Sequence, residues 1–409
     1  MVALSACGVP SSPPNEDPVL QRGLSAQPES LDPQLARSVA SGKVLGDMYE
    51  GLYTRDAAGQ RVAGVIEDGG MALSGDARRY TFTLRTDARW SDGSPVTAAD
   101  FVRGWRFLAD PDNAAFYADL ITPLENARDI AIGAKLPSTL GVSARDAHTL
   151  DVVLTAPQPD FLERLAHPAL APRAPDANLT NGAYRLASVA SGGVVSMHAN
   201  PYFHAADTVA IKAVNYTSYE QEQTEYNAFR SGALDITSRV PRQLFLGDAP
   251  KPDTLRVTPY LGVAFLTMNM REPPSLALRR ALSLAIDRVA LAEDVLARGE
   301  TPAYGLVPPG TRNGEEDYQV YLPDHAMLDA TARIAAARTA MAQAMATAER
   351  APQITLSYAS SDENRVVALA LQAMWREVLP ELTVTLINKE FRVLLAEARS
   401  GQFDGMIRS

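Results

Sequence analysis

The sequence predicts an α+β region followed by an α/β region. Residues 80–85, "YTFTLR", alternate apolar and polar side chains, as a strand with one buried face does. After residue 353, strand-like and helix-like segments alternate, which is typical of βαβ units and a parallel sheet. The length of 409 residues is that of two or three domains.

Turn and capping residues predict the first helices. "VLGDMYEGLY", residues 44–53, predicts a short helix that ends near Gly51. "RWSDGSPVTAADF", residues 89–101, predicts a tight turn and then a helix, because Thr97 and Asp100 have the spacing of a capping box. A lone serine and aspartate in such a turn are structural in most proteins, so we interpret this segment as scaffold. The helix would place four apolar side chains on one face: Phe101, Val102, Trp105 and Leu108.

The middle of the chain predicts further strands. Residues 148–157 alternate as a strand, and residues 181–201 have the pattern of a hairpin with a Ser-Gly-Gly turn. Residues 208–219 predict another strand, and a helix over 221–231 would end at Gly232.

The C-terminal region predicts long helices between strands. Residues 275–299 read as one helix, with Ser275 as its cap and Gly299 as its stop. The remaining predicted elements are a helix within 324–350, a strand at 353–359, a helix over 362–379, a strand at 381–388, a helix from Phe391 and the beginning of a strand at 403–407.

Composition excludes several classes of protein. The formal net charge is 38 − 48 = −10, and no basic run is present, which argues against nucleic-acid binding and against attraction to an anionic membrane. No stretch is long and apolar enough to span a bilayer. The single cysteine, Cys7, excludes a disulfide within the chain.

Catalytic and metal-binding patterns are missing from the sequence. It contains no nucleophile elbow, zinc-protease motif, P-loop or dinucleotide fingerprint. His198 and His204 are the nearest histidine pair, but no third ligand accompanies them, so a turn around Pro201 is the simpler interpretation. We therefore expect no catalytic residue, no metal and no cofactor.

Two groups of segments resemble known families. "LSAC", residues 4–7, resembles the lipobox of bacterial lipoproteins, in which the cysteine carries lipid; the alternative is an incidental cysteine in a flexible tail. Eight further segments, in order along the chain, resemble the extracellular solute-binding proteins that feed peptides to bacterial ABC importers, in particular the oligopeptide-binding branch. They are "PESLDPQLARS", "MYEGLY", "YTFTLRTDARWSDGSPVTAADFV", "NARDIAIGAK" with "LGVSARDAHTL", "TNGAY", "RSGALDI", "LALRRALSLAIDR" and "GETPAYGLVPPG".

This resemblance implies a two-lobed periplasmic-binding-protein-like fold with three domains and a hinge between the lobes. Residues 1–16 would be a signal-peptide remnant with lipobox and tether, and the C-terminal part of the fold would be missing. The expected domains are a discontinuous first lobe of residues 17–62 and 168–261, an inserted domain of residues 63–167, and an opposing lobe of residues 262–409.

The resemblance also implies a ligand site. Thr267 and Asn364 stand where the best-known oligopeptide binders carry a glutamate and a histidine, which predicts a site of different charge. By default Glu50 and Arg399 would be solvated charges on surface helices, and Phe265 and Tyr117 could equally be core residues. The implied ligand-binding residues are Glu50, Leu52, Tyr53, Tyr117, His167, Arg239, Phe265, Thr267, Asn269, Asn364 and Arg399.

The expected function is capture of extended oligopeptides in a cleft between the lobes and delivery to the permease subunits of an ABC importer. The same fold could instead bind a dipeptide, a glycoside or a metal complex, or act as a signal-peptide receptor; a peptidase has no support from the sequence. We expect a monomer in the periplasm or on the outer cell surface, held to the membrane only by lipid on Cys7.

Overall fold

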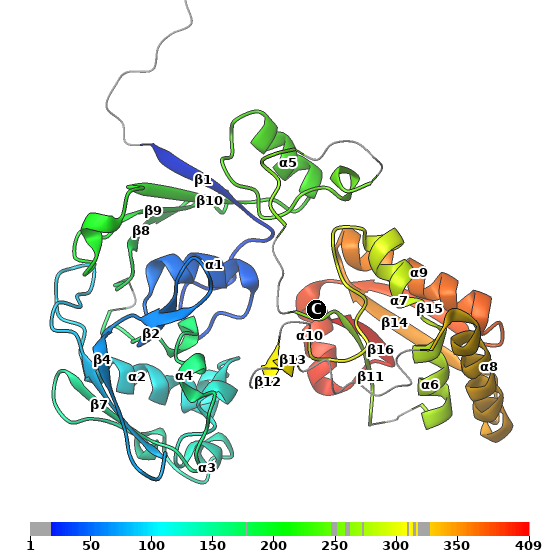
Figure 1. Ribbon diagram of the computed structural model, residues 1–409, viewed down its shortest axis with the longest axis horizontal. Coiled ribbons are helices and arrows are strands. Elements are labelled where there is room, and N and C mark those ends of the chain that lie inside the picture. Colours follow the sequence, from blue (N-terminus) through cyan, green and yellow to red (C-terminus); the bar gives the residue numbers. More distant parts are fainter. Residues whose placement is uncertain are drawn as a thin grey trace, which may run out of the picture. The chain divides into compact units, whose positions relative to one another are not determined.

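The computed structural model describes residues 18–176, 178–246, 252–257, 262–271, 274–308, 311–313, 316–317 and 328–408. These residues form two compact units, the first ending at Pro241 and the second beginning at Arg242 (Figure 1). Cys7, and with it the predicted lipobox, lies outside the described residues. None of the described helices is long and apolar enough to cross a membrane.

The first sheet of the first unit combines segments that are far apart in the chain. Its order is β1-β10-β9-β8, with β1 parallel to β10 and the other pairs antiparallel. The predicted hairpin over residues 181–201 is confirmed, and its turn places Gly193 at φ 79°. Helix α1 contributes Val44 and Met48 to the core beneath this sheet. The bounds are β1 Val19–Leu24, α1 Val39–Met48, β8 Tyr184–Val189, β9 Val195–Ala199 and β10 Ala213–Ser218.

The second sheet of this unit is built from a continuous stretch of chain. Its order is β4-β5-β7-β6, and all its pairs are antiparallel. Tyr80, Phe82 and Leu84 of β5 point into the core, as the alternation predicts. A separate two-stranded hairpin, β2-β3, precedes this sheet. The bounds are β2 Tyr53–Arg55, β3 Arg61–Ala63, β4 Ile66–Leu73, β5 Arg79–Leu84, β6 Val142–Ala144 and β7 Thr149–Val153.

The segment 89–101 is scaffold, as predicted. Thr97 and Asp100 form the capping box that begins α2 (Ala98–Ala109), with the Thr97 N–H donating to Asp100 Oδ2 at 2.8 Å. Asp100 is buried and also accepts a hydrogen bond from the indole Nε1 of Trp90 at 3.3 Å. The four apolar residues predicted on one helix face are all buried: Phe101, Val102, Trp105 and Leu108.

Short helices connect these strands, and the predicted helix before Gly232 is confirmed as α5. In the first unit they are η1 Pro111–Asn113, η2 Ala118–Ile121, α3 Ala127–Ala131, η3 Pro137–Thr139, α4 Phe161–Arg164, η4 Pro168–Leu170, η5 Ala206–Thr208 and α5 Glu222–Arg230.

The predicted helix over residues 44–51 is wrong in its limits. Helix α1 begins five residues earlier, because the Ser38 side chain accepts a hydrogen bond from the Ser41 N–H and caps it. It ends at Met48, because Tyr49 is already extended and the Met48 carbonyl accepts a hydrogen bond from the Gly182 N–H at 2.8 Å. A tertiary contact therefore ends the helix before Gly51.

The second unit holds one mixed four-stranded sheet of order β11-β16-β14-β15. The predicted parallel pairing is confirmed for β14 with β15 and β16, whereas β11 is antiparallel to β16. Helices α6, α8 and α9 share one core with this sheet, in which the Trp375 Nε1 donates to the Leu282 carbonyl at 2.9 Å (Figure 1). The bounds are η6 Arg242–Leu244, β11 Phe265–Met268, β12 Arg312–Asn313, β13 Glu316–Asp317, α8 Ala330–Thr347, β14 Gln353–Ala359, α9 Asp362–Val378, β15 Thr383–Lys389, α10 Phe391–Ser400 and β16 Gly405–Arg408.

The single helix predicted over residues 275–299 is wrong. Ser275 caps α6 as predicted, but α6 (Leu276–Ala285) ends before Asp287, which is extended. Asp287 starts a new helical segment by accepting a hydrogen bond from the Ala290 N–H, and it also pairs with Arg333 at 2.7 Å. The new segment comprises α7 Arg288–Ala290 and the π-helix η7 Leu291–Leu296. An aspartate inside an apolar pattern was thus a second cap rather than part of one helix.

Candidate functional site

Glu50 is a buried carboxylate. The default expectation of a solvated charge on a surface helix is therefore wrong for this residue. It follows α1, is 9 % exposed, and its Oε2 lies 2.8 Å from the Nε2 of His204. Because a carboxylate only accepts hydrogen bonds, this His204 nitrogen is the donor. No described residue donates a hydrogen bond to its other oxygen, Oε1. The pair joins the end of α1 to the loop after β9.

The backbone of Glu50 is held separately by Asn181. The Asn181 Nδ2 donates to the Glu50 carbonyl at 2.8 Å, and its Oδ1 accepts from the Glu50 N–H at 3.2 Å. Gly182 beside it approaches α1 so closely that a Cβ there would lie 2.6 Å from the Met48 carbonyl carbon. The "TNGAY" segment is therefore a clasp on the chain that leads into the predicted site.

Charged groups surround the Glu50–His204 pair. The hydrogen bond that Arg85 donates to Asp87 is the largest cause that favours the charged form of Arg85 and raises its pKa, and the field of Glu50 acts in the same direction. The same bond lowers the pKa of the Asp87 carboxyl, and His204 adds to that lowering. Opposite charges therefore alternate from Asp87 through Arg85 to Glu50.

Leu52 and Tyr53 carry mainly structural contacts. The Leu52 side chain is fully buried in the core, and its carbonyl accepts a hydrogen bond from the Gly64 N–H at 3.0 Å. The Tyr53 ring is buried under the Arg61 guanidinium at 4.5 Å, and burial raises the pKa of its phenol. Gly51 between them and Glu50 approaches the Leu165 carbonyl, which brings this segment beside the one that ends in His167.

Tyr117 and His167 lie together, as two of the predicted residues. Their ring centroids are 4.4 Å apart, and the Tyr117 hydroxyl donates to the Arg37 carbonyl at 3.4 Å. The Nδ1 of His167 accepts from the Ala169 N–H at 3.1 Å, which leaves Nε2 as the protonated nitrogen of the neutral ring. Burial lowers the pKa of His167, while the Asp119 carboxylate acts in the opposite direction.

Arg239 bonds to a different part of the first unit from the residues above. Its terminal nitrogen donates to the carbonyls of Ser25, Tyr219 and Glu220, each at 3.3 Å. Its Nε is buried and finds no hydrogen-bond partner among the residues the structure describes. The guanidinium thus ties the end of β1 to the segment after β10.

In the second unit, two predicted residues lie on β11 and a third, Asn269, directly follows it. Phe265 is 39 % exposed, so it is not a core residue. The Thr267 Oγ1 is buried without a hydrogen-bond partner in the described part of the unit. Asn269 is fixed at the end of the strand, because its N–H donates to the Asp404 carbonyl and its Nδ2 to the Gly401 carbonyl, both at 2.9 Å.

The last two predicted residues lie on helices. Asn364 is in the first turn of α9, where its N–H donates to the Ser361 hydroxyl at 3.1 Å and completes the cap. The backbone of Arg399 belongs to α10, but its side chain lies outside what the structure describes. Within the described residues, no hydrogen bond joins Asn364 to β11.

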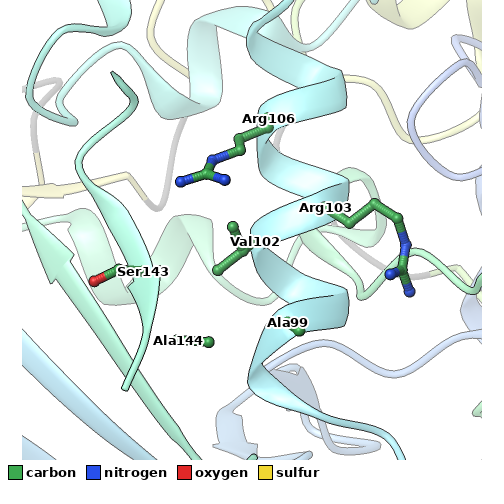
Figure 2. Close-up of a pocket in the computed structure, with 6 residues that line it drawn as sticks. All are labelled: Ala99, Val102, Arg103, Arg106, Ser143 and Ala144. Carbon is green, nitrogen blue, oxygen red and sulfur yellow. The ribbon is translucent and has the colours of Figure 1, made fainter. Parts of the chain in front are cut away.

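A cavity of about 600 Å³ lies elsewhere in the first unit, between α2 and β6 (Figure 2). Arg106 extends toward the strand that carries Ser143, whereas Arg103 extends to the other side of the helix, where it binds Asp100 and the Arg173 carbonyl. None of the predicted site residues lines this cavity. Within the described ranges, no group of three or more His, Cys, Asp or Glu side chains could hold a metal ion.

Sequence reasoning missed the partners that hold the predicted residues. His204 was interpreted only as part of a turn, and Asn181 only as part of a resembling segment. The signal available was chemical, since a buried glutamate requires a donor and two histidines lay in one short segment. Neither pattern says which glutamate the histidine meets.

Comparison with known proteins decides the family. Residues 31–409 match the model of "Bacterial extracellular solute-binding proteins, family 5 Middle". The chain belongs to this family. Membership supports a periplasmic or extracellular location and the context of an ABC transporter.

Relatives in the family are named as binding proteins. The chain is 34 % identical to the periplasmic oligopeptide-binding protein OppA of Escherichia coli K12, over 95 % of this chain and 74 % of the relative. It is 30 % identical to the probable deoxycholate-binding periplasmic protein YgiS of the same strain, over 98 % and 77 %. The crystal structure of Haemophilus influenzae OppA in complex with RPPGFSPFR has a TM-score of 0.85, with 29 % identity over 96 % of this chain and 80 % of that one. The fold is therefore the two-lobed α/β fold of solute-binding proteins.

Proposed function

We propose that this chain is the peptide-binding component of an ABC importer and delivers oligopeptides to the permease subunits. The observation that carries the proposal is the match in sequence and fold to oligopeptide-binding proteins, one of them in complex with RPPGFSPFR. The chain would act by binding and release, without catalysis and without a cofactor.

The position of β11 at the edge of its sheet supports this function. Strand β11 lies at the end of its sheet, so one side of its backbone has no strand partner in the described sheet. An extended peptide can add to such an edge through main-chain hydrogen bonds, which give affinity without requiring one sequence. Phe265, exposed on β11, would then pack against a side chain of the peptide.

The remaining site residues stay part of the proposal. Glu50, Tyr117 and His167 would contribute from the first unit, with the segment 50–53 held in place by the "TNGAY" clasp. Thr267 and Asn269 would contribute from β11, because a buried hydroxyl without a partner gains a hydrogen bond when a ligand supplies one. Roles for Leu52, Arg239, Asn364 and Arg399 rest on the resemblance alone.

We also propose the domain architecture that the resemblance implies. The first sheet draws its strands from residues 19–24 and 184–218, and the second lies wholly within 66–153, which supports a discontinuous domain with an insertion. We further propose a monomer that is anchored by lipid on Cys7. Mass spectrometry of the protein from its own cells would detect the lipid, and light scattering would give the oligomeric state.

Peptide binding is tested by calorimetry after bound ligand has been removed by unfolding and refolding. Defined peptides of three to five residues are titrated, with deoxycholate as the comparator. We expect micromolar or tighter Kd values for peptides, and mass spectra that show the peptides intact after incubation. Binding of deoxycholate without peptide binding would overturn the peptide proposal, and cleavage of the peptides would indicate an enzyme.

A further inference from the structure

The loop that carries His204 is built to hold that side chain in one place. Asn200 is 1 % exposed, donates from Nδ2 to the Gly182 carbonyl at 3.1 Å, and accepts at Oδ1 from the Tyr202 N–H at 3.0 Å. Gly182 in turn donates to the Met48 carbonyl. The His204 loop and the segment before Glu50 therefore belong to one hydrogen-bonded assembly.

The Glu50 carboxylate depends on this loop for its only donor among the described residues. Both side chains are about nine-tenths buried, with 11 % of His204 and 10 % of Glu50 exposed, and Oε2 faces Nε2 at 2.8 Å. A carboxylate removed from water needs hydrogen-bond donors on its oxygens. Oε2 has one in His204, whereas no described residue donates to Oε1, which can therefore accept another hydrogen bond.

The backbone at Glu50 does not need His204. Asn181 holds both the N–H and the carbonyl of Glu50, and the next two residues are held by hydrogen bonds of their carbonyls to Gly64 and Val65. What His204 adds is the direction of the carboxylate. A bond that leaves the chain path unchanged but fixes one side-chain rotamer is expected where that side chain acts on another molecule.

We propose that His204 is a positioning residue, which holds the Glu50 carboxylate so that Oε1 accepts a hydrogen bond from an N–H donor of the bound peptide. This inference rests on the proposed function. It assigns His204 a role in affinity that no resemblance gave it.

The test is a double-mutant cycle measured as Kd by calorimetry, with a peptide that binds the wild-type protein. His204→Leu should raise Kd about tenfold, the factor that loss of one charge-assisted hydrogen bond gives. His204→Gln should stay within about threefold of wild type, because the glutamine amide can still donate to Oε2. In a Glu50→Gln background, His204→Leu should change Kd less than twofold.

Controls separate positioning from folding. His198→Leu changes an exposed histidine on the neighbouring strand β9 and should leave Kd unchanged. Thermal unfolding of each variant reports stability, and the milder His204→Gln keeps the test valid if His204→Leu does not fold. Wild-type Kd values in both His204 variants, or an equal effect of His204→Leu in the Glu50→Gln background, would overturn this inference alone. Absence of peptide binding by the wild type would overturn it together with the proposed function.

Discussion

Glu50 of the first unit and the β11 residues Phe265 and Thr267 of the second unit are held in opposite ways. In the first unit, Glu50 is bonded by side chains that lie 131 and 154 residues further along the chain. In the second, Phe265 is exposed and Thr267 has a buried hydroxyl without a partner among the described residues. The difference teaches that Glu50 is already fixed by its surroundings, whereas the Thr267 hydroxyl lacks a hydrogen bond among the described residues.

The largest expected effect tests how tightly the first unit is fixed. Gly182→Ala would place a Cβ within 2.8 Å of three backbone atoms of residues 47–49. Backbone cannot move aside as a flexible side chain can, so we expect a loss of about 3 kcal/mol in the free energy of unfolding. Urea unfolding gives the size, and hydrogen exchange should place the loss in the first unit.

The matched control is Gly46→Ala on the exposed side of α1, where a Cβ meets nothing within 4 Å. Alanine favours helix over glycine, so this variant should gain about 0.5–1 kcal/mol. Equal stability of the two variants would contradict the tight packing of Gly182 against the backbone at the end of α1.

Asn181→Ala should have the next largest effect. It leaves the buried N–H and carbonyl of Glu50 without partners, and we expect a loss of about 2 kcal/mol by urea unfolding. Asn178→Ala, at an exposed asparagine whose hydrogen bonds in the described part of the chain go to Asp176, should cost less than about 0.5 kcal/mol. A similar cost for both variants would mean that the two hydrogen bonds between Asn181 and the Glu50 backbone add little to stability.

Thr267→Val tests the second unit. We expect this variant to be more stable than wild type but to bind peptide more weakly. Removing a buried hydroxyl without a partner should raise the free energy of unfolding by up to about 1 kcal/mol. If the hydroxyl serves a ligand, calorimetry should show a several-fold higher peptide Kd. Thr267→Ser keeps the hydroxyl and is the control. A less stable Thr267→Val protein would show that the hydroxyl is satisfied within the fold.

The smallest effect is a pH dependence at the start of α1. Burial alone would raise the pKa of Glu29, but hydrogen bonds from the Ser38 hydroxyl and the N–H groups of Arg37 and Ser38 outweigh it and lower the pKa to about 2. A lowered folded-state pKa stabilises the fold above the unfolded value of 4.5, and this contribution is lost as pH falls from about 4.5 toward 2. Solvent screening of this exposed side chain keeps the contribution below about 1 kcal/mol.

Glu29→Gln should therefore be less stable than wild type at pH 6, and the difference should shrink as the pH approaches 2. Thermal unfolding across this range measures it, with Glu349→Gln at an exposed residue of the second unit as the control. A difference that grows toward low pH would contradict the assignment.

Local signals predicted local structure well. The capping box of Thr97 and Asp100, the apolar face of α2 and the alternation of β5 are all set by neighbouring residues, and all are confirmed. The break at Asp287 was missed because an aspartate in an apolar pattern can be either a helix surface residue or a cap. Choosing between them requires knowing that Arg333 packs there.

The candidate site was predictable only as separate segments. The resemblance located Glu50 and "TNGAY", but nothing in the sequence links Glu50 to His204, because pairing over such separations leaves no periodic pattern. The same limit applies to Thr267. Whether its hydroxyl finds a hydrogen-bond partner depends on the packing around β11. Residue types were predictable, whereas their bonding partners required the fold.

Strand β1 determines when the first sheet can close during synthesis. It pairs with β10 in a register that sets Val19 opposite Ala213, so 213 − 19 = 194 further residues must be made before β1 finds its partner. At the usual rate of translation this takes roughly 10 to 40 s. Until then the first sheet cannot close, and Leu24, fully buried in the finished fold, remains in water. For a protein that works outside the cytoplasmic membrane this delay is an advantage, because a chain that has not yet folded can still be threaded through a secretion channel.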